Sequence, residues 1–144
     1  MRIALDLDGV IADCGDLESP LVQARMTAPG FFLGLPAVEG AIEGVRALQG
    51  RHEVLVCSSA MFVPHAFAEK FSWLRRNLPF VDPAQLIFCG AKHVIAADVL
   101  VDDSEHHVQA FAGRGILFHA AIGARDPHVE RARDWRELLA MLGC

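Results

Sequence analysis

Continuous apolar runs, rather than alternating ones, divide this chain into short segments. Strands that are buried on both faces of a parallel sheet have this pattern, because neither face meets water. The chain is therefore predicted to contain five strands, at about residues 2–8, 53–58, 85–89, 97–102 and 115–119.

Helical patterns occupy the intervals between these runs. Apolar residues recur with helical spacing over 38–48, and Gly50 follows as a stop signal. A second helix is predicted to open at Pro64, because proline is favoured in the first turn. The residues expected on its buried face are Phe67, Phe71 and Leu74.

A last helical pattern follows Asp134, whose side chain is placed to cap it together with Glu137, and Gly143 closes it. Strands that alternate with helices predict an α/β fold with a doubly wound, mainly parallel sheet. A length of 144 residues suits one domain with a substantial core, so a single domain over 1–144 is predicted.

The segment 12–36 fits neither pattern well. Residues 12–26 are compatible with a short helix, and 28–36 is typical of a loop in which Phe31 and Phe32 have no obvious partner. Because it follows Asp6 and Asp8, two acidic residues at the end of the first predicted strand, this cap-like insertion is placed to cover a site there. Phe31 and Phe32 are therefore candidates for a substrate cover, and packing under the sheet is the alternative.

Composition restricts the partners of the chain. A net charge of −5 argues against binding to a nucleic acid polymer, which requires a basic surface. Although 53% of the residues are hydrophobic, no run approaches the ~20 apolar residues of a membrane span. Asp6 and Asp8 lie where a signal peptide would need an apolar stretch, so a cytoplasmic protein is expected.

Acidic residues end two of the predicted strands. Asp6 and Asp8 close the first strand, with Gly9 permitting a sharp turn, and Asp102 and Asp103 close the fourth. Carboxylates are costly to crowd together unless a cation or a reaction needs them. If both pairs share one metal, the first and fourth strands are neighbours, which creates a topological switch point where open α/β sheets bind ligands.

Two other strand ends add a hydroxyl group and an amine. Ser58, with Ser59 as its rival, can donate a hydrogen bond to a phosphoryl oxygen. Lys92 can neutralise the charge that spreads over a phosphoryl group. Only Lys70 accompanies it as a lysine, beside eleven arginines, which suggests a specific need for Lys92. Together these residues indicate a magnesium-dependent phosphoryl-transfer site.

The histidines add little to this interpretation. His106 and His107 are adjacent, and neighbouring helical residues point in different directions, so no metal site is predicted from them.

With these residues the chain resembles the haloacid-dehalogenase superfamily. Asp6-Leu-Asp-Gly-Val10 matches the first motif of the superfamily, Ser58 the second, Lys92 the third and Asp102-Asp103 the fourth. The likeness covers roughly residues 2–119. Four stretches resemble more narrowly the 5′(3′)-deoxyribonucleotidase family: Gly30-Phe-Phe-Leu-Gly-Leu-Pro36, Glu69-Lys-Phe-Ser-Trp-Leu74, Leu86-Ile-Phe-Cys-Gly90 and Ala97-Asp-Val-Leu-Val-Asp-Asp103.

The resemblance implies a strand order of 5-4-1-2-3 and a phosphomonoester hydrolase that acts on a nucleoside monophosphate. Asp6 would form an aspartyl-phosphate, and Asp8 would act as general acid and base. Mg²⁺ would be held by the Asp6 carboxylate, the Asp8 main-chain carbonyl and Asp103, with Asp102 in support. The residues expected to bind phosphate are Ser58, Ser59, Lys92 and Gly9.

The chain departs from the family in two places. Its insertion is much shorter than the helical cap of the animal enzymes, and 119–123 reads His-Ala-Ala-Ile-Gly where relatives often carry an Ala-Pro-His-Asn-like turn. Both differences fall where the leaving group of the substrate would be recognised. A sugar phosphate or another small phosphomonoester is therefore the alternative substrate. The oligomeric state stays open, a homodimer included.

A phospho-accepting signalling module of receiver type is a more distant alternative. That fold needs its phospho-accepting aspartate at the end of a middle strand, where this chain has Cys57-Ser58.

Overall fold

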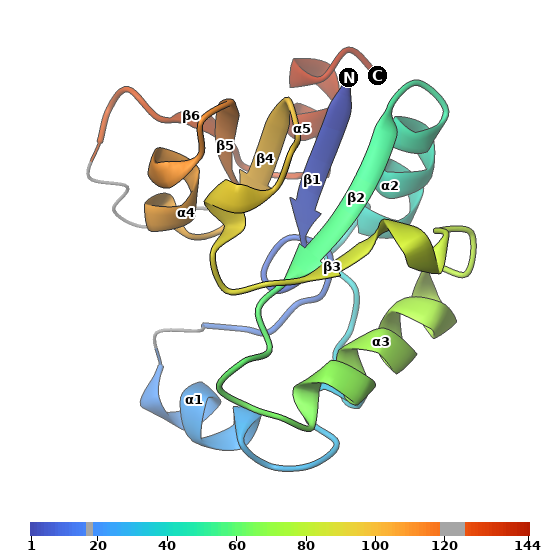
Figure 1. The fold of residues 1–144 in the computed structure, drawn as a ribbon, viewed down its shortest axis with the longest axis vertical. Coiled ribbons are helices and arrows are strands. Elements are labelled where there is room, and N and C mark those ends of the chain that lie inside the picture. Colours follow the sequence, from blue (N-terminus) through green and yellow to red (C-terminus); the bar gives the residue numbers. More distant parts are fainter. Residues whose placement is uncertain (17–18, 119–125) are drawn as a thin grey trace.

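A parallel sheet forms the centre of the molecule in the computed structural model, which describes residues 1–16, 19–118 and 126–144 (Figure 1). Its strands run in the order β3-β2-β1-β4-β5-β6. Their bounds are β1 Arg2–Asp6, β2 Glu53–Ser58, β3 Leu86–Phe88, β4 Val99–Asp102, β5 Arg114–Phe118 and β6 Glu130–Ala132. The α/β class and the 5-4-1-2-3 order are confirmed.

The predicted count of five strands is wrong, because β6 extends the sheet beyond β5. It pairs in parallel, with Ile116 opposite Glu130 and Phe118 opposite Ala132. An ion pair of 2.6 Å between Arg114 and Glu130 joins the same two strands. Two of the three β6 residues are exposed, so this edge strand lacks the apolar run that revealed the others.

Both faces of the sheet are covered, and the alternation along β1 separates them. Ile3 and Leu5 belong to a large cluster with residues of α2 (Ala41–Gln49), α3 (Ala66–Asn77) and α5 (Trp135–Met141). Ala4 faces the other way, in a smaller cluster with Ile95 and Phe111. The second face carries η3 (Lys92–Val94) and α4 (Glu105–Ala110), which contact each other.

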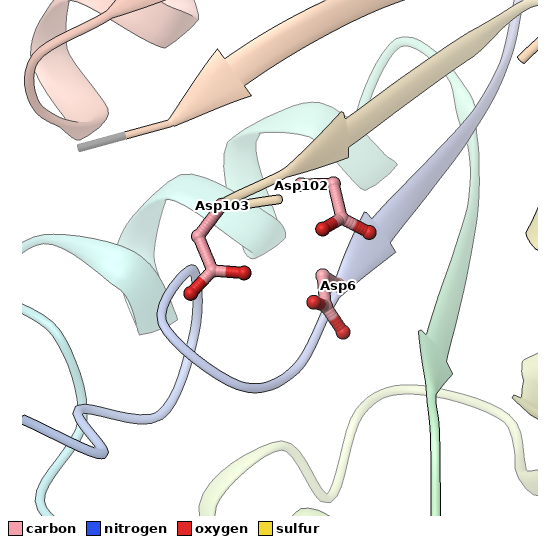
Figure 2. Close-up of side chains that lie close together, drawn as sticks. All are labelled: Asp6, Asp102 and Asp103. Carbon is pink, nitrogen blue, oxygen red and sulfur yellow. The ribbon is translucent and has the colours of Figure 1, made fainter. Parts of the chain in front are cut away.

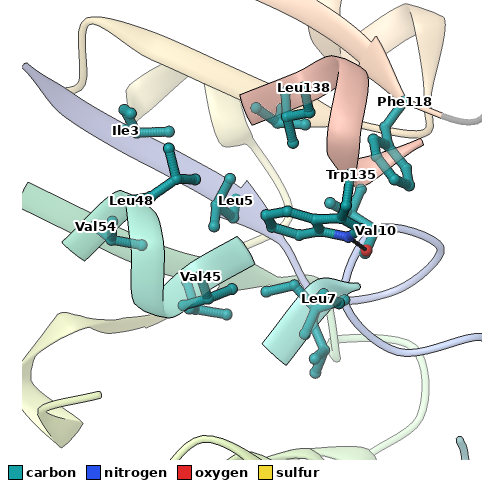
Figure 3. Packing of buried hydrophobic residues seen from close by; sticks show 14 of the residues in the cluster. Ile3, Leu5, Leu7, Val10, Val45, Leu48, Val54, Phe118, Trp135 and Leu138 are labelled. Carbon is teal, nitrogen blue, oxygen red and sulfur yellow. Dashed lines mark hydrogen bonds between the residues drawn. The ribbon is translucent and has the colours of Figure 1, made fainter. Parts of the chain in front are cut away.

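The core also anchors the loop that follows β1 (Figure 3). Leu7, Val10 and Ile11 are buried although they lie outside any strand. The indole nitrogen of Trp135 donates to the Val10 carbonyl at 2.8 Å. The ring of Trp135 lies 5.9 Å from that of Phe118, centroid to centroid. The loop that bears Asp8 is therefore fixed by apolar packing.

The C-terminal helix begins as predicted, since the Asp134 side chain accepts a hydrogen bond of 2.8 Å from the Glu137 amide. Of the three residues predicted on the buried face of α3, only Leu74 is buried, and the prediction is wrong for the other two. Phe67 and Phe71 are 39% and 42% exposed, whereas Glu69 and Lys70 are buried. Polar partners on the insertion and in the site, described below, hold these two residues inside and outweigh the apolar periodicity.

The insertion lies beyond the carboxyl ends of β1 and β2 in Figure 1. It contains α1 (Pro20–Met26), which has no buried residue, and the short η1 (Phe32–Gly34), which contacts α3. Within the described residues, no helix is long and apolar enough to cross a membrane.

Candidate active site

Three carboxylates meet where β1 and β4 end. These strands pair directly, with Leu5 opposite Val101, so Asp6 reaches the same edge of the sheet as Asp102 and Asp103. One oxygen of each carboxylate lies within 4.8 Å of the other two. Figure 2 shows the three side chains pointing into one common space. The sequence-based pairing of the two acidic strand ends is therefore present in the fold.

Lys92 is the cation of this cluster. It is 2% exposed, and its Nζ lies 2.7 Å from Asp6 Oδ2 and 2.7 Å from Asp102 Oδ2. Burial alone would lower the pKa of Lys92, but the attraction of Asp6 and Asp102 outweighs burial and raises that pKa. Lys92 is thus a fixed positive charge held between the two strand ends.

One lysine does not balance three carboxylates. Burial, together with repulsion from Asp102, raises the pKa of Asp6 well above its usual value. The same two causes raise the pKa of Asp103 to about 7. For Asp102, burial is outweighed by a hydrogen bond from His107 and by the charge of Lys92, so its pKa is lowered. The excess negative charge favours a further cation at Asp6 and Asp103.

Gly9 allows Asp103 to approach the first loop. Its φ of 75° lies in the left-handed region, and a methyl group there would collide with Asp103 Oδ2. Its amide donates to the Ala12 carbonyl at 2.9 Å. The contact with Asp103 explains the glycine, and the phosphate-binding role of Gly9 stays a prediction.

A second polar cluster surrounds Asp8. Ser58 Oγ donates to Asp8 Oδ2 at 2.7 Å, and Lys70 Nζ lies 2.6 Å from the same oxygen. Lys70 also donates to Ser58 Oγ at 2.9 Å and to the Ser59 carbonyl at 2.7 Å. The thiol of Cys14 lies 3.5 Å from Asp8 Oδ1. Asp6 and Asp8 therefore each have their own lysine.

Lys70 is the main site residue that the sequence analysis missed. Its side chain is buried at 2% exposure in the middle of α3. The signal was present in the composition, because both lysines of the chain lie in this site, while none of the arginines among the described residues lines the pocket. The rarity of lysine pointed to Lys92 in the sequence, and it holds equally for Lys70.

His107 is a second residue that the sequence analysis passed over. Its Nδ1 lies 3.2 Å from Asp102 Oδ2 and 3.3 Å from Oδ1. The amide of Ser104 donates to Asp102 Oδ1 at 2.9 Å. Asp102 is thus held by Lys92, His107 and Ser104, which leaves Asp103 as the freer carboxylate of the pair.

A pocket of about 240 Å³ opens over the two clusters. Phe32, at 2% exposure, lines it together with Ser59 and with Phe62, which is 94% exposed at the rim. Phe31 does not line the pocket and instead packs edge-on against Phe32, with ring centroids 5.1 Å apart. Of the two predicted cover residues, Phe32 is therefore the one at the pocket wall. The 119–123 segment lies outside the described residues.

Comparison with known proteins places these residues in a family. The family described as "5' nucleotidase, deoxy (Pyrimidine), cytosolic type C protein" matches residues 15–143. The chain belongs to this family. Its putative 5'(3')-deoxyribonucleotidase relative from Staphylococcus epidermidis is 36% identical, over 95% of this chain and 93% of that protein. The 5'(3')-deoxyribonucleotidase of Bacillus subtilis is 31% identical, over 74% of this chain and 62% of that protein.

Solved structures show the same fold. The D,D-heptose 1,7-bisphosphate phosphatase of Burkholderia thailandensis superposes with a TM-score of 0.68 over 99% of both chains, at 17% identity. A haloacid dehalogenase-like family hydrolase of Xanthomonas campestris also gives 0.68, over 99% of this chain and 94% of that one, at 13% identity. The family and the haloacid-dehalogenase fold that the motifs predicted are confirmed, and the family is one of phosphoric monoester hydrolases.

Proposed function

We propose that this chain is a Mg²⁺-dependent nucleotidase of the 5′(3′)-deoxyribonucleotidase type, which works through an aspartyl-phosphate on Asp6. The observation that carries the proposal is that Asp6 and Asp8, two aspartates of the same motif, lie in two different polar clusters. Asp6 lies against Lys92 and two further carboxylates, whereas Asp8 lies against Lys70 and Ser58. Two carboxylates in different environments suit two different roles in one reaction. Family membership supports the same activity.

The carboxylate cluster fits a divalent cation. Its donors are oxygens, the ligands that Mg²⁺ prefers, and their spacing lets a single ion reach all three. Asp6 and Asp103 would hold the ion with the Asp8 main-chain carbonyl. Asp102, already held by Lys92, would support them. When bound, Mg²⁺ would neutralise the carboxylates and polarise the phosphoryl group.

Asp6 would attack phosphorus with a carboxylate oxygen. Its Oδ1 accepts from the Leu7 amide at 2.8 Å and its Oδ2 from Lys92, which fixes the orientation of the carboxylate and leaves further lone pairs free. The new oxygen–phosphorus bond forms as the bond to the leaving oxygen breaks. Asp8, protonated, would transfer its proton to that oxygen.

Water would then complete the reaction. Asp8, now a carboxylate, would take a proton from water, whose oxygen attacks phosphorus and releases inorganic phosphate and the Asp6 carboxylate. Ser58, Ser59 and Lys70 would donate to phosphoryl oxygens from one side, and Lys92 from the other. In the substrate-free chain Ser58 and Lys70 bind Asp8 instead, so a phosphoryl group would replace that carboxylate as their acceptor.

Phosphate release from a panel of phosphomonoesters tests the proposal. The purified chain should hydrolyse deoxynucleoside 5′- or 3′-monophosphates with Mg²⁺ and lose this activity in excess EDTA. Asp6→Asn is the control for contaminating phosphatases. Sugar phosphates belong in the same panel. A preference for one of them would agree with the proposed reaction and contradict the nucleotide as substrate. Activity that survives exhaustive EDTA treatment would contradict the metal dependence.

A further inference from the structure

The carboxylate of Glu69 binds the main chain of the insertion. Its Oε1 accepts from the Gly30 amide at 2.7 Å, and its Oε2 accepts from the Phe32 amide at 3.2 Å. The side chain is only 9% exposed, and no ion pair of the described residues includes it. Because Glu69 lies in the first turn of α3, the helix dipole also favours its charge there. Two main-chain amides therefore satisfy a buried carboxylate.

Two more side chains on the same stripe of α3 continue this contact. The indole nitrogen of Trp73 donates to the Leu35 carbonyl at 2.8 Å, and the guanidinium of Arg76 donates to the Leu33 carbonyl. Glu69 is spaced four residues before Trp73, which places them on one helix face. The stripe thus binds the insertion from Gly30 to Leu35, and Glu69 directly precedes Lys70, which lines the pocket.

Lys70, the next residue, holds the other end of Phe32. Its Nζ lies 4.6 Å from the centroid of the Phe32 ring, within range of a cation–π contact. Glu69 fixes the main chain of Phe32, while Lys70 lies over its ring and the buried Ala60 and Ala66 belong to the same hydrophobic cluster. Adjacent residues of α3 therefore set the position of one pocket wall.

We infer that Glu69 is a positioning residue for recognition of the leaving group. It acts through Phe32, because its two hydrogen bonds place that ring against the pocket, and it does not itself line the pocket. The inference rests on the proposed function, since a leaving group exists only if a phosphomonoester binds here. Substrate selectivity then depends partly on Glu69, a buried carboxylate outside the catalytic motifs.

The test compares a large and a small leaving group in Glu69→Gln. Glutamine keeps the size of the side chain but presents an NH₂ group to one of the two amides. A lost hydrogen bond to a charged group should raise KM for thymidine monophosphate by about tenfold. KM for acetyl phosphate should stay within about twofold, because Asp8 and Ser58 hold Lys70 independently of Phe32. Glu69→Asp, which retains two acceptor oxygens on a shorter arm, should give an intermediate shift.

Glu43→Gln is the matched control, since Glu43 is an exposed carboxylate in the first turn of α2. It should leave both KM values unchanged. Equal KM shifts for the two substrates in Glu69→Gln, or none for either, would overturn the positioning role.

Hydrogen exchange tests the contact without catalysis. Of the Gly30 and Phe32 amides, the one that faces the new NH₂ group loses its acceptor and should exchange about tenfold faster in Glu69→Gln than in wild type or Glu43→Gln. Unchanged exchange in the 28–36 segment would overturn the inference. Faster exchange in a chain that hydrolyses no phosphomonoester would support the contact and contradict only the proposed function.

Discussion

The pocket has two sides that are built in different ways. On one side, Asp6, Asp102 and Asp103 project from the ends of paired strands, and Lys92 from the turn after β3. On the other side, α3 holds an inserted loop through hydrogen bonds between the side chains of the helix and the main chain of the loop. Sheet pairing fixes the first side, whereas a few individual side chains fix the second. Substitutions in α3 can therefore alter the second side without changing the strand pairing that fixes the first.

The difference also appears in electrostatics. The strand side carries three carboxylates against one lysine, and this excess is what a metal would neutralise. On the α3 side, Lys70 pairs with Asp8, and Glu69 is satisfied by amides. We expect substitutions on the strand side to affect turnover and metal binding, and substitutions of the α3 residues that hold the inserted loop to affect selectivity. Lys70 is the exception on the α3 side, because it contacts Asp8 and should therefore affect turnover.

The largest effect is expected at the strand side, from Asp6→Asn. The amide keeps the shape of the side chain but is not a nucleophile, so turnover should fall by at least about 10⁴-fold, as for other nucleophiles. Phosphate release measures the loss, and circular dichroism checks the fold. Asp13→Asn, at an exposed aspartate, is the control. Near wild-type turnover of Asp6→Asn would show that another residue is the nucleophile.

Lys70→Met is expected to have the next largest effect. It removes the charged donor shared by Asp8, Ser58 and the Ser59 carbonyl. Loss of one such donor to a developing charge typically costs about 10²–10³-fold in kcat. Arg136→Met, at an exposed cation, is the control. An effect confined to KM would indicate that Lys70 contacts the leaving group and not the phosphoryl group.

The carboxylates of β4 should differ in their effect on metal binding. Asp102 is held by Lys92, His107 and the Ser104 amide, whereas Asp103 is freer to bind an ion. Asp103→Asn should therefore raise the Mg²⁺ concentration for half-maximal activity more than Asp102→Asn, whose effect should be about 10–100-fold. Magnesium titrations decide the assignment, and a larger shift for Asp102→Asn would reverse it.

Phe62→Ala should act on selectivity and only weakly. The ring is almost fully exposed at the rim, where the leaving group would extend. An aromatic contact of this kind is worth about 0.5–1.5 kcal/mol, so KM for a nucleotide should rise about 2–10-fold, with kcat unchanged. Acetyl phosphate kinetics supply the comparison. A loss of kcat would place Phe62 closer to the chemistry than the pocket shows.

The smallest effect concerns metal-free stability and pH. Asp103 has a pKa of about 7 in the folded chain and an ordinary value when unfolded, so the folded state binds its proton more tightly. This stabilisation is complete below about pH 4 and is lost as pH rises through 7. In EDTA, the melting temperature should be higher at pH 5.5 than at pH 8, by about 4 °C. Asp103→Asn should reduce this difference, and an unchanged difference would assign it to other groups.

The sequence predicted the strand side well. Buried strands leave long apolar runs, and residues at their ends must meet at one edge, so the positions of Asp6 and Asp102 followed from the pattern. β6 was not predicted because it pairs through its backbone and has little apolar surface. The buried positions of Lys70 and Glu69 were not predicted, because a polar residue in a helix is expected to be exposed unless its partners are known. Two of these partners, Asp8 and Gly30, lie in loops, whose path no periodicity predicts.

The most direct test of the central claim is to trap the phosphorylated aspartate. Acid quench during turnover of a nucleoside monophosphate with Mg²⁺, followed by borohydride reduction, converts an aspartyl-phosphate to homoserine. Peptide mass spectrometry should find homoserine at position 6 only, and it should disappear when substrate or Mg²⁺ is omitted. Homoserine at another aspartate, or rapid turnover with none at position 6, would contradict the account.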